Sequence, residues 1–182
     1  MTRTLIIGGA RSGKSAHAEA LAIASGKQLV YIATAQAQDE EMSVRIRHHR
    51  EHRDEQWQTV EEPIALGAAL AGHSGPDTLV MVDCLTVWLS NLLFSEAKDF
   101  PEIGLINPPA SFHRERALFL QALEQAKGDV ILVSNEVGQG IVPQGAVSRW
   151  FVDEAGRLNQ AVAACCERAI FIVAGLPLTL KG

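Results

Sequence analysis

Short apolar runs alternate with longer amphipathic stretches along most of the 182-residue chain. The apolar runs are typical of buried strands, and the amphipathic stretches are typical of helices that cover a sheet. Since strands that alternate with helices form βαβ crossovers, we predict an α/β fold with a mainly parallel sheet and helices on both faces. The expected strands are 3–7, 28–34, 57–60, 78–82, 130–134 and 169–174, and the expected helices are 14–24, 63–70, 86–94, 111–127 and 147–166. Leu118, Leu120 and Leu123 are expected on the apolar side of the fourth helix.

Composition favours one domain over residues 1–182 with the balance of an ordinary globular protein. Hydrophobic residues make up 47% and charged residues 20%, and the net charge is −5. The absence of a basic excess argues against nucleic acid as the main partner, and no apolar run has the length of a membrane span. Cys84, Cys165 and Cys166 cannot form a disulfide framework, so we expect a cytoplasmic protein.

A glycine-rich segment separates the first expected strand from the first helix. It reads GGARSGKS and matches the G-x-x-x-x-G-K-S phosphate-binding loop (P-loop) in the strand–loop–helix context that this motif requires. Glycines let successive N–H groups point at phosphate oxygens, and the helix adds its positive end. Lys14 is expected to reach the β and γ phosphates, and Ser15 to bind Mg²⁺. The predicted phosphate-binding residues are Gly8, Gly9, Ala10, Arg11, Ser12, Gly13, Lys14 and Ser15.

Two further polar positions follow apolar strands. Asp83 closes the strand 78–82, where P-loop proteins place a carboxylate that holds Mg²⁺ directly or through water. We favour that role over a simple helix cap. Asn135 and Glu136 follow the strand 130–134 and either position substrate or water or belong to an ordinary turn. Because ligands bind at the carboxyl ends of parallel strands, we expect these residues near the P-loop.

The segment 39–55 is unusually rich in basic and imidazole side chains. A neutral imidazole is a nucleophile near neutral pH, and flanking arginines favour the neutral form and balance phosphate charge. This composition suits attack on a nucleotide phosphate. A solvated charged face without chemical function and a zinc site are the alternatives. The residues are Arg45, Arg47, His48, His49, Arg50, His52 and Arg53.

Six motifs occur in an order that resembles one enzyme family over essentially the whole chain. They are GGARSGKS at 8–15, YIAT at 31–34, RIRHHR at 45–50, Trp57 with Thr59 and Glu61, NEVGQGIVP at 135–143, and AGRLNQ at 155–160. Together they resemble the bifunctional adenosylcobinamide kinase/adenosylcobinamide-phosphate guanylyltransferase of cobalamin biosynthesis. The P-loop is widely shared, whereas the histidine segment and the NEVG loop are much more specific.

The resemblance implies a RecA-like P-loop fold, a homotrimer and two reactions. In the first, a nucleoside triphosphate such as ATP phosphorylates adenosylcobinamide. In the second, GTP gives its GMP to a histidine, which matches His48 here, and adenosylcobinamide phosphate takes it to form adenosyl-GDP-cobinamide.

The resemblance also implies which residues contact the guanine nucleotide. The family often has Glu where this chain has Asp83, and the shorter side chain favours a water-mediated Mg²⁺ contact. Besides the P-loop, the implied contacts are Thr34, Ala35, Gln36, His49, Arg50, Glu51, His52, Glu61 and Asp83.

Two other functions remain open from the sequence. One is a P-loop kinase of a small metabolite without a covalent intermediate. The other is a RecA-type regulatory module switched by a nucleotide. The histidine pair at 48–49 distinguishes the bifunctional enzyme from the simple kinase, because only the former needs a nucleophile on the protein.

Overall fold

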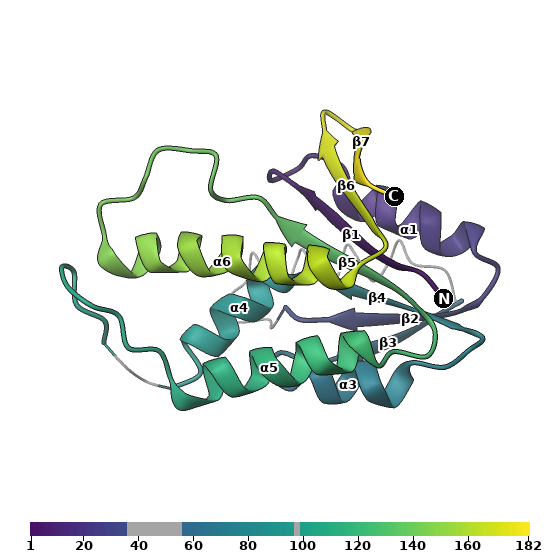
Figure 1. The fold of residues 1–182 in the computed structure, drawn as a ribbon, viewed down its shortest axis with the longest axis horizontal. Coiled ribbons are helices and arrows are strands. Elements are labelled where there is room, and N and C mark those ends of the chain that lie inside the picture. Colours follow the sequence, from purple (N-terminus) through teal and green to yellow (C-terminus); the bar gives the residue numbers. More distant parts are fainter. Residues whose placement is uncertain (36–55, 97–98) are drawn as a thin grey trace.

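A seven-stranded sheet forms the centre of the protein (Figure 1). A computed structural model describes residues 1–35, 56–96 and 99–182. The strand order is β3-β2-β4-β5-β1-β6-β7, and every neighbouring pair is parallel except β6 and β7. The strands are β1 (Arg3–Gly8), β2 (Gln28–Ala33), β3 (Trp57–Glu61), β4 (Thr78–Asp83), β5 (Asp129–Asn135), β6 (Arg168–Val173) and β7 (Leu176–Lys181).

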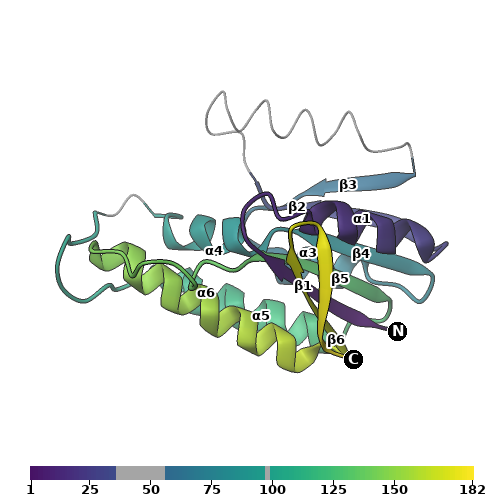
Figure 2. The ribbon, with the colours of Figure 1, turned by 90° about the horizontal axis from the view of Figure 1, so that it is seen from above.

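Helices cover both faces of this sheet. Figure 2 shows α1 on one face and α4, α5 and α6 on the other, and the buried residues of α3 belong to the core on that second face. The predicted mainly parallel sheet with helices on both faces is therefore confirmed. The helices are α1 (Lys14–Ala24), α3 (Leu66–His73), α4 (Leu85–Leu93), α5 (Ala110–Glu124) and α6 (Ala146–Cys165).

Two cores follow from the alternation of side chains along the strands. The larger one is built around Trp88 and Phe119, whose rings meet at a centroid distance of 5.0 Å. The smaller one lies under α1, where Ala18 and Ala22 face the central strands. The small alanine side chains let α1 lie close to the sheet, which fixes the helix start beside the end of β1.

Two predicted helix boundaries are wrong for local reasons. The helix expected at 63–70 begins at Leu66, because a Glu62 carboxylate oxygen accepts the N–H groups of Ile64 and Ala65 at 2.9 and 2.7 Å and holds the chain in a turn. The helix expected at 111–127 ends at Glu124. Of the three leucines expected on its apolar side, Leu123 is buried and Leu120 packs against the core, whereas Leu118 is exposed. The buried residues of α5 are Phe112, Glu115, Phe119 and Leu123.

Strand β7 is absent from the prediction. It forms a hairpin with β6 through a two-residue turn in which Ala174 and Gly175 have φ values of 51° and 77°. Two successive positive φ values are typical of the tight turns that match strand twist. Pro177 is tolerated because β7 is an edge strand. The signal in the sequence was the alternation of leucine with other residues from 176 to 180.

The structure also bears on two expectations from composition. None of the helices in the described ranges has the length and apolar character needed to cross a membrane. All three cysteines are free thiols, with Cys84 and Cys166 buried and Cys165 partly exposed.

Candidate functional site

Three segments singled out in the sequence meet at the carboxyl end of the sheet. Strand β5 lies between β4 and β1, so the segments after these three strands are neighbours. In the register, Gly8 pairs with Asn135, and Asp83 pairs with Val133. The P-loop, Asp83 and Asn135 are therefore brought together as predicted.

The P-loop turns sharply before α1 begins. Arg11 and Gly13 have left-handed φ values of 55° and 95°, and the Ser12 N–H donates to the Gly9 carbonyl at 3.3 Å. The first turn of α1 has neither a side-chain cap nor an acidic residue. Its N–H groups and the positive end of its dipole are therefore available to an anion.

Glycine is required at two positions of this loop. A Cβ at Gly8 would lie 2.6 Å from both the Ile172 carbonyl oxygen and the Ser12 hydroxyl oxygen. A Cβ at Gly13 would lie 3.3 Å from the Gly175 Cα, and its left-handed φ disfavours other residues. The loop can follow this tight path only without side chains at these points.

Neighbouring segments hold the P-loop from both sides. The Gly175 N–H, in the β6–β7 turn, donates to the Ser12 carbonyl at 2.9 Å. The Glu136 N–H, just after β5, donates to the Gly8 carbonyl at 3.1 Å. The role of Gly175 is absent from the prediction because the contact depends on the hairpin turn before β7, a strand that was not predicted.

Lys14 places a buried cation at the loop. Its Nζ donates to the Gly9 carbonyl at 3.0 Å, and the side chain forms no ion pair with any residue in the described ranges. Hence its charge is not neutralised by a carboxylate of those ranges. This arrangement is suited to phosphate oxygens.

Asp83 and Ser15 supply oxygen atoms at the same end of the sheet. Asp83 comes two residues after Met81 in β4, so both side chains lie on the same face of the sheet. This is the face covered by α1, in which Ser15 occupies the second helical position. Asp83 is half-buried and, within the ranges described, forms no ion pair. A carboxylate and a hydroxyl are the hard oxygen ligands that Mg²⁺ prefers, so these residues fit the ion.

Thr34 supports the segment that follows Asp83. Its hydroxyl donates to the Cys84 carbonyl at 2.8 Å and accepts the Cys84 N–H at 2.9 Å. The Asn91 amide donates to the Thr34 carbonyl at 2.7 Å. Thr34 is fully buried, and these contacts fix the chain directly after Asp83; Ala35, the next residue, is partly exposed.

Cys84 is unsuited to act as a nucleophile. Burial, together with the neighbouring Asp83 carboxylate, raises the pKa of its thiol to about 11. Because the thiolate is the reactive form, the protonated Cys84 is inert near neutral pH. Covalent chemistry at this end of the sheet therefore needs another group.

Asn135 is a site candidate that lies outside the predicted nucleotide-binding set. Its backbone is held by the Thr86 hydroxyl, which accepts its N–H at 2.8 Å, and by the Asn159 amide, which donates to its carbonyl at 3.3 Å. Its side-chain amide reaches the Cys84 sulfur at 3.9 Å. The sequence predicts Asn135 near the P-loop, and the sheet order adds that its strand lies between the P-loop strand and the strand of Asp83.

Glu61 is distant from this group. It ends β3, which is four strands from β1 in the sheet order. Four strand spacings of about 4.8 Å correspond to roughly 19 Å, so Glu61 is in reach of only the far end of an extended nucleotide. Its role as a nucleotide contact stays a prediction.

Six predicted residues lie outside the described residues. They include the histidine proposed as the nucleophile, and their roles stay predictions. In the part of the chain that the structure describes, no group of three or more His, Cys, Asp and Glu could hold a metal ion. The six are Gln36, His48, His49, Arg50, Glu51 and His52.

Solved structures support the nucleotide-binding fold. A prototypical ATPase from the type III secretion system of pathogenic bacteria is similar with a TM-score of 0.54 and 12% identity, over 98% of this chain and 56% of the ATPase. The assembled ATPase EscN of enteropathogenic E. coli is similar with the same TM-score of 0.54 and 13% identity, over 95% of this chain and 43% of EscN. The RecA-like P-loop fold predicted from the sequence is confirmed.

Curated relatives are far more similar in sequence. The bifunctional adenosylcobalamin biosynthesis protein CobP of Pseudomonas aeruginosa is 51% identical over 180 residues, covering 99% of this chain and 98% of that protein. The corresponding protein CobU of Escherichia coli is 41% identical over 179 residues, covering 97% and 98%. The family model described as CobU, cobinamide kinase / cobinamide phosphate guanyltransferase, matches residues 4–180. The chain belongs to this family of cobinamide kinases and cobinamide phosphate guanyltransferases.

Proposed function

We propose that the protein phosphorylates adenosylcobinamide with a nucleoside triphosphate and then transfers GMP from GTP to adenosylcobinamide phosphate through His48. Membership of the family supports both activities. The observation that carries the proposal onto residues of this chain is the P-loop, with a Lys14 that forms no ion pair within the described ranges, at the same end of the sheet as Asp83. The other specific support is the RIRHHR segment at 45–50.

The first reaction is a displacement at the γ phosphate. The hydroxyl oxygen of adenosylcobinamide forms a bond to the γ phosphorus, the bond to the β–γ bridging oxygen breaks, and the hydroxyl proton passes to solvent. Loop N–H groups and Lys14 hold the phosphates in line and balance the charge that moves onto the leaving diphosphate. Ser15 and Asp83 would hold Mg²⁺, which supplies further charge neutralisation on the phosphates.

The second reaction takes place at the α phosphate of GTP. An imidazole nitrogen of His48 forms a bond to the α phosphorus, and the bond to the α–β bridging oxygen breaks to release pyrophosphate. A phosphate oxygen of adenosylcobinamide phosphate then forms a bond to the same phosphorus, and the N–P bond breaks. The covalent intermediate divides the transfer into two in-line steps. The protonated Cys84 supports histidine as the nucleophile.

Incubation with GTP labelled at the α phosphate, followed by denaturation, tests the covalent step. Wild-type protein should retain label in an acid-labile, alkali-stable linkage, as a phosphoramidate does, and His48→Ala should abolish it. His73→Ala is the matched control, because it removes an imidazole at the end of α3, close to the amino end of β4, and should leave label attached.

The outcomes of the labelling experiment separate the candidate functions. Label that persists in His48→Ala assigns the nucleophile to another residue. No label in wild type, together with phosphorylation of cobinamide, favours a kinase without a covalent step. Nucleotide hydrolysis without either transfer favours the regulatory module.

We further propose that the protein acts as a homotrimer in the cytoplasm, as the resemblance implies. Light scattering of the purified protein tests the trimer, and a monomer or dimer at working concentration contradicts it.

A further inference from the structure

Two loops at the carboxyl end of the sheet lie against each other. One is residues 99–109, between α4 and α5, and the other is residues 136–145, between β5 and α6. The Ala146 N–H, at the start of α6, donates to the Glu102 carbonyl at 3.0 Å. Figure 1 shows both loops on the side of the molecule toward which the parallel strands point.

Both loops are fixed on their inner sides. Phe100, Ile106 and Val137 pack against the larger core, and the Phe100 ring meets the Phe94 ring edge-on at 5.7 Å. The Arg149 guanidinium donates to the Pro143 carbonyl at 3.3 Å and to the Gln144 carbonyl. The loops are thus anchored by their own side chains and by the start of α6.

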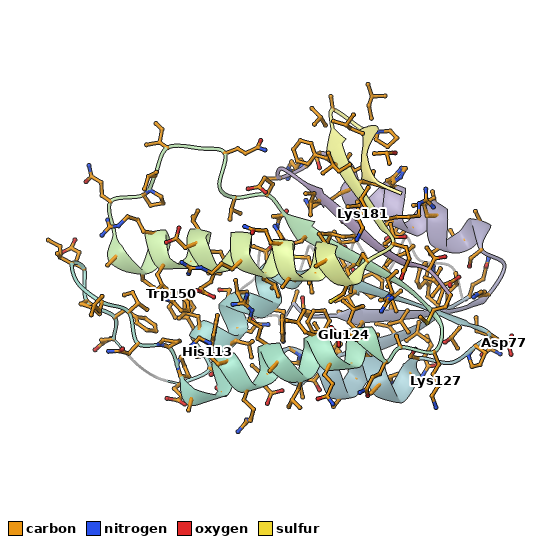
Figure 3. The ribbon with its side chains drawn as sticks, in the orientation of Figure 1. Asp77, His113, Glu124, Lys127, Trp150 and Lys181 are labelled. Carbon is orange, nitrogen blue, oxygen red and sulfur yellow. The ribbon has the colours of Figure 1, made fainter. Side chains whose placement is uncertain are left out.

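Aromatic side chains of α5 and α6 belong to, or lie next to, the core against which the loops pack. The centroid of the Phe112 ring lies 5.0 Å from that of the Trp150 ring and 5.3 Å from that of the His113 ring. Figure 3 shows Trp150 and His113 together where α6 and α5 begin. Phe112 is part of the core against which Phe100, Ile106 and Val137 pack, so the inner sides of the loops lie on a buried core.

The outer sides of the same loops present large apolar side chains to solvent. Ile103, Leu105, Ile141 and Val142 are 86%, 88%, 99% and 72% exposed. Of the five large apolar side chains that exceed 70% exposure in the described ranges, these are four. Single exposed apolar residues are ordinary, but four on two touching loops mark a binding surface.

We propose that these four side chains form a docking surface, the loop platform, for the corrin ring of the cobinamide acceptor. The assignment rests on the proposed function, since that function requires a bulky acceptor to bring its hydroxyl or phosphate to the nucleotide. A corrin ring is a large macrocycle edged with methyl groups and amide arms, and an anchored apolar surface is complementary to it.

The loop platform is continuous with the nucleotide site. Loop 136–145 begins at Glu136, whose N–H donates to the P-loop carbonyl of Gly8 at 3.1 Å. Loop 99–109 belongs to the connection that starts after Asp83. An acceptor bound at the loop platform therefore lies at the carboxyl end of the sheet, where the phosphates bind.

The charge of the two connections fits the same occupant. The two loops 99–109 and 136–145 contain three carboxylates and no lysine or arginine. Adenosylcobinamide is a monocation, because cobalt(III) exceeds by one the combined negative charge of the corrin and adenosyl ligands. An acidic surface attracts such a cation and repels a second nucleotide. The carboxylates are those of Asp99, Glu102 and Glu136.

The test is the double variant Leu105→Ser/Ile141→Ser. The KM for adenosylcobinamide in the phosphorylation assay should rise about tenfold, because two apolar contacts with the ring are lost. Equilibrium dialysis with adenosylcobinamide should show the same loss of affinity. The KM for the nucleotide and the rate of self-labelling from GTP should stay within about twofold of wild type, since neither needs the acceptor.

Two further variants control the experiment. Leu180→Ser removes a leucine that is 56% exposed on β7 at the opposite end of the sheet, and it should leave the KM for adenosylcobinamide unchanged. Ile141→Ser alone cannot disturb the core, because that side chain is 99% exposed, so its KM should rise even if the double variant folds poorly.

The result that overturns the loop platform is an unchanged affinity for adenosylcobinamide in the loop variants while wild-type protein turns over both substrates. A changed oligomeric state with unchanged affinity assigns the surface to contact with a second copy and also overturns it. Failure of the wild-type protein to phosphorylate adenosylcobinamide overturns the proposed function instead.

Discussion

The two ends of the sheet differ in whether their charged side chains form ion pairs with one another. At the amino end, charged groups pair with one another: Lys27 lies 2.8 Å from Asp129, and Arg3 lies 2.5 Å from Glu167. At the carboxyl end, Lys14 and Asp83 form no ion pair within the described ranges. Figure 3 shows how far apart the ends lie, with Lys127 and Asp77 toward one and Trp150 and His113 toward the other.

This difference separates residues that stabilise the fold from residues that are available to ligands. Charged side chains that pair within the chain stabilise the folded state. Because they are already paired, they attract a phosphate only weakly. The left-handed backbone at Arg11 and Gly13 persists at the carboxyl end because neighbouring segments hold the P-loop by hydrogen bonds. The variants below test whether charged residues at the amino end affect mainly stability and those at the carboxyl end affect mainly activity.

The largest effect is expected for Lys14→Ala. Both transfer reactions should lose about a hundredfold or more in kcat/KM, because one cation serves the phosphates in both. Lys27→Ala is the matched control at the amino end, and it should lower the melting temperature with both activities retained. Steady-state kinetics and thermal unfolding of the two variants measure this; retained phosphorylation in Lys14→Ala contradicts a single nucleotide site.

Asp83→Asn is expected to reduce kcat about tenfold to a hundredfold and to raise the Mg²⁺ concentration required for half-maximal rate. The amide is nearly the same size as the carboxylate, so the melting temperature should stay close to that of wild type. Titration of the rate with Mg²⁺ is the measurement. A large loss of thermal stability with an unchanged Mg²⁺ requirement would make Asp83 a structural cap.

Thr34→Val should lower both stability and activity, because Thr34 lies at the carboxyl end of the sheet yet is fully buried. The valine leaves the Cys84 N–H without its acceptor, which should cost about 1–3 kcal/mol of unfolding free energy. Because the chain after Asp83 also loosens, activity should fall by a smaller factor than in Asp83→Asn. Denaturant unfolding checks the first expectation, and a variant as stable as wild type would show that this hydrogen-bond pair does not support the site.

The smallest effect is expected for Glu167→Gln at the amino end. Its hydrogen bonds with Arg3 lower the pKa of the Glu167 carboxyl from 4.5 to about 2. A lowered folded-state pKa stabilises the protein above the unfolded pKa, and this contribution is lost as pH falls from about 4.5 toward 2. Because the carboxylate is exposed, the difference near neutral pH should be below about 1 kcal/mol.

Urea unfolding of wild type and Glu167→Gln across this pH range checks the sign. The two proteins should converge in stability at the acidic end, and both activities should be unchanged. A difference that grows as the pH falls would contradict the assignment.

Much of the fold could be predicted because local patterns and tertiary structure agree. Helix α1 has the predicted bounds 14–24, since it starts at the P-loop motif and ends at Ser25-Gly26. The central strands were apolar runs without ambiguity. The grouping of the P-loop with Asp83 followed from the rule that parallel strands end on the same side.

The remaining features depend on contacts that single-chain patterns do not encode. The β6–β7 hairpin holds the P-loop through Gly175, and although the alternating leucines of β7 indicate a strand, they do not indicate this contact. The start of α3 depends on one side chain, Glu62. The contacts of Thr34 became visible only once β2 and β4 were seen as neighbours.

The most direct test of the central claim, that one phosphate cradle serves both reactions, is inhibition by an ATP analogue with a non-hydrolysable β–γ bond. Its inhibition constant should be the same, within about twofold, against phosphorylation of adenosylcobinamide and against self-labelling of the protein from GTP. Inhibition should be competitive with the nucleotide in each case. Self-labelling that continues undiminished at analogue concentrations that abolish phosphorylation would contradict the account, because it requires a second nucleotide site.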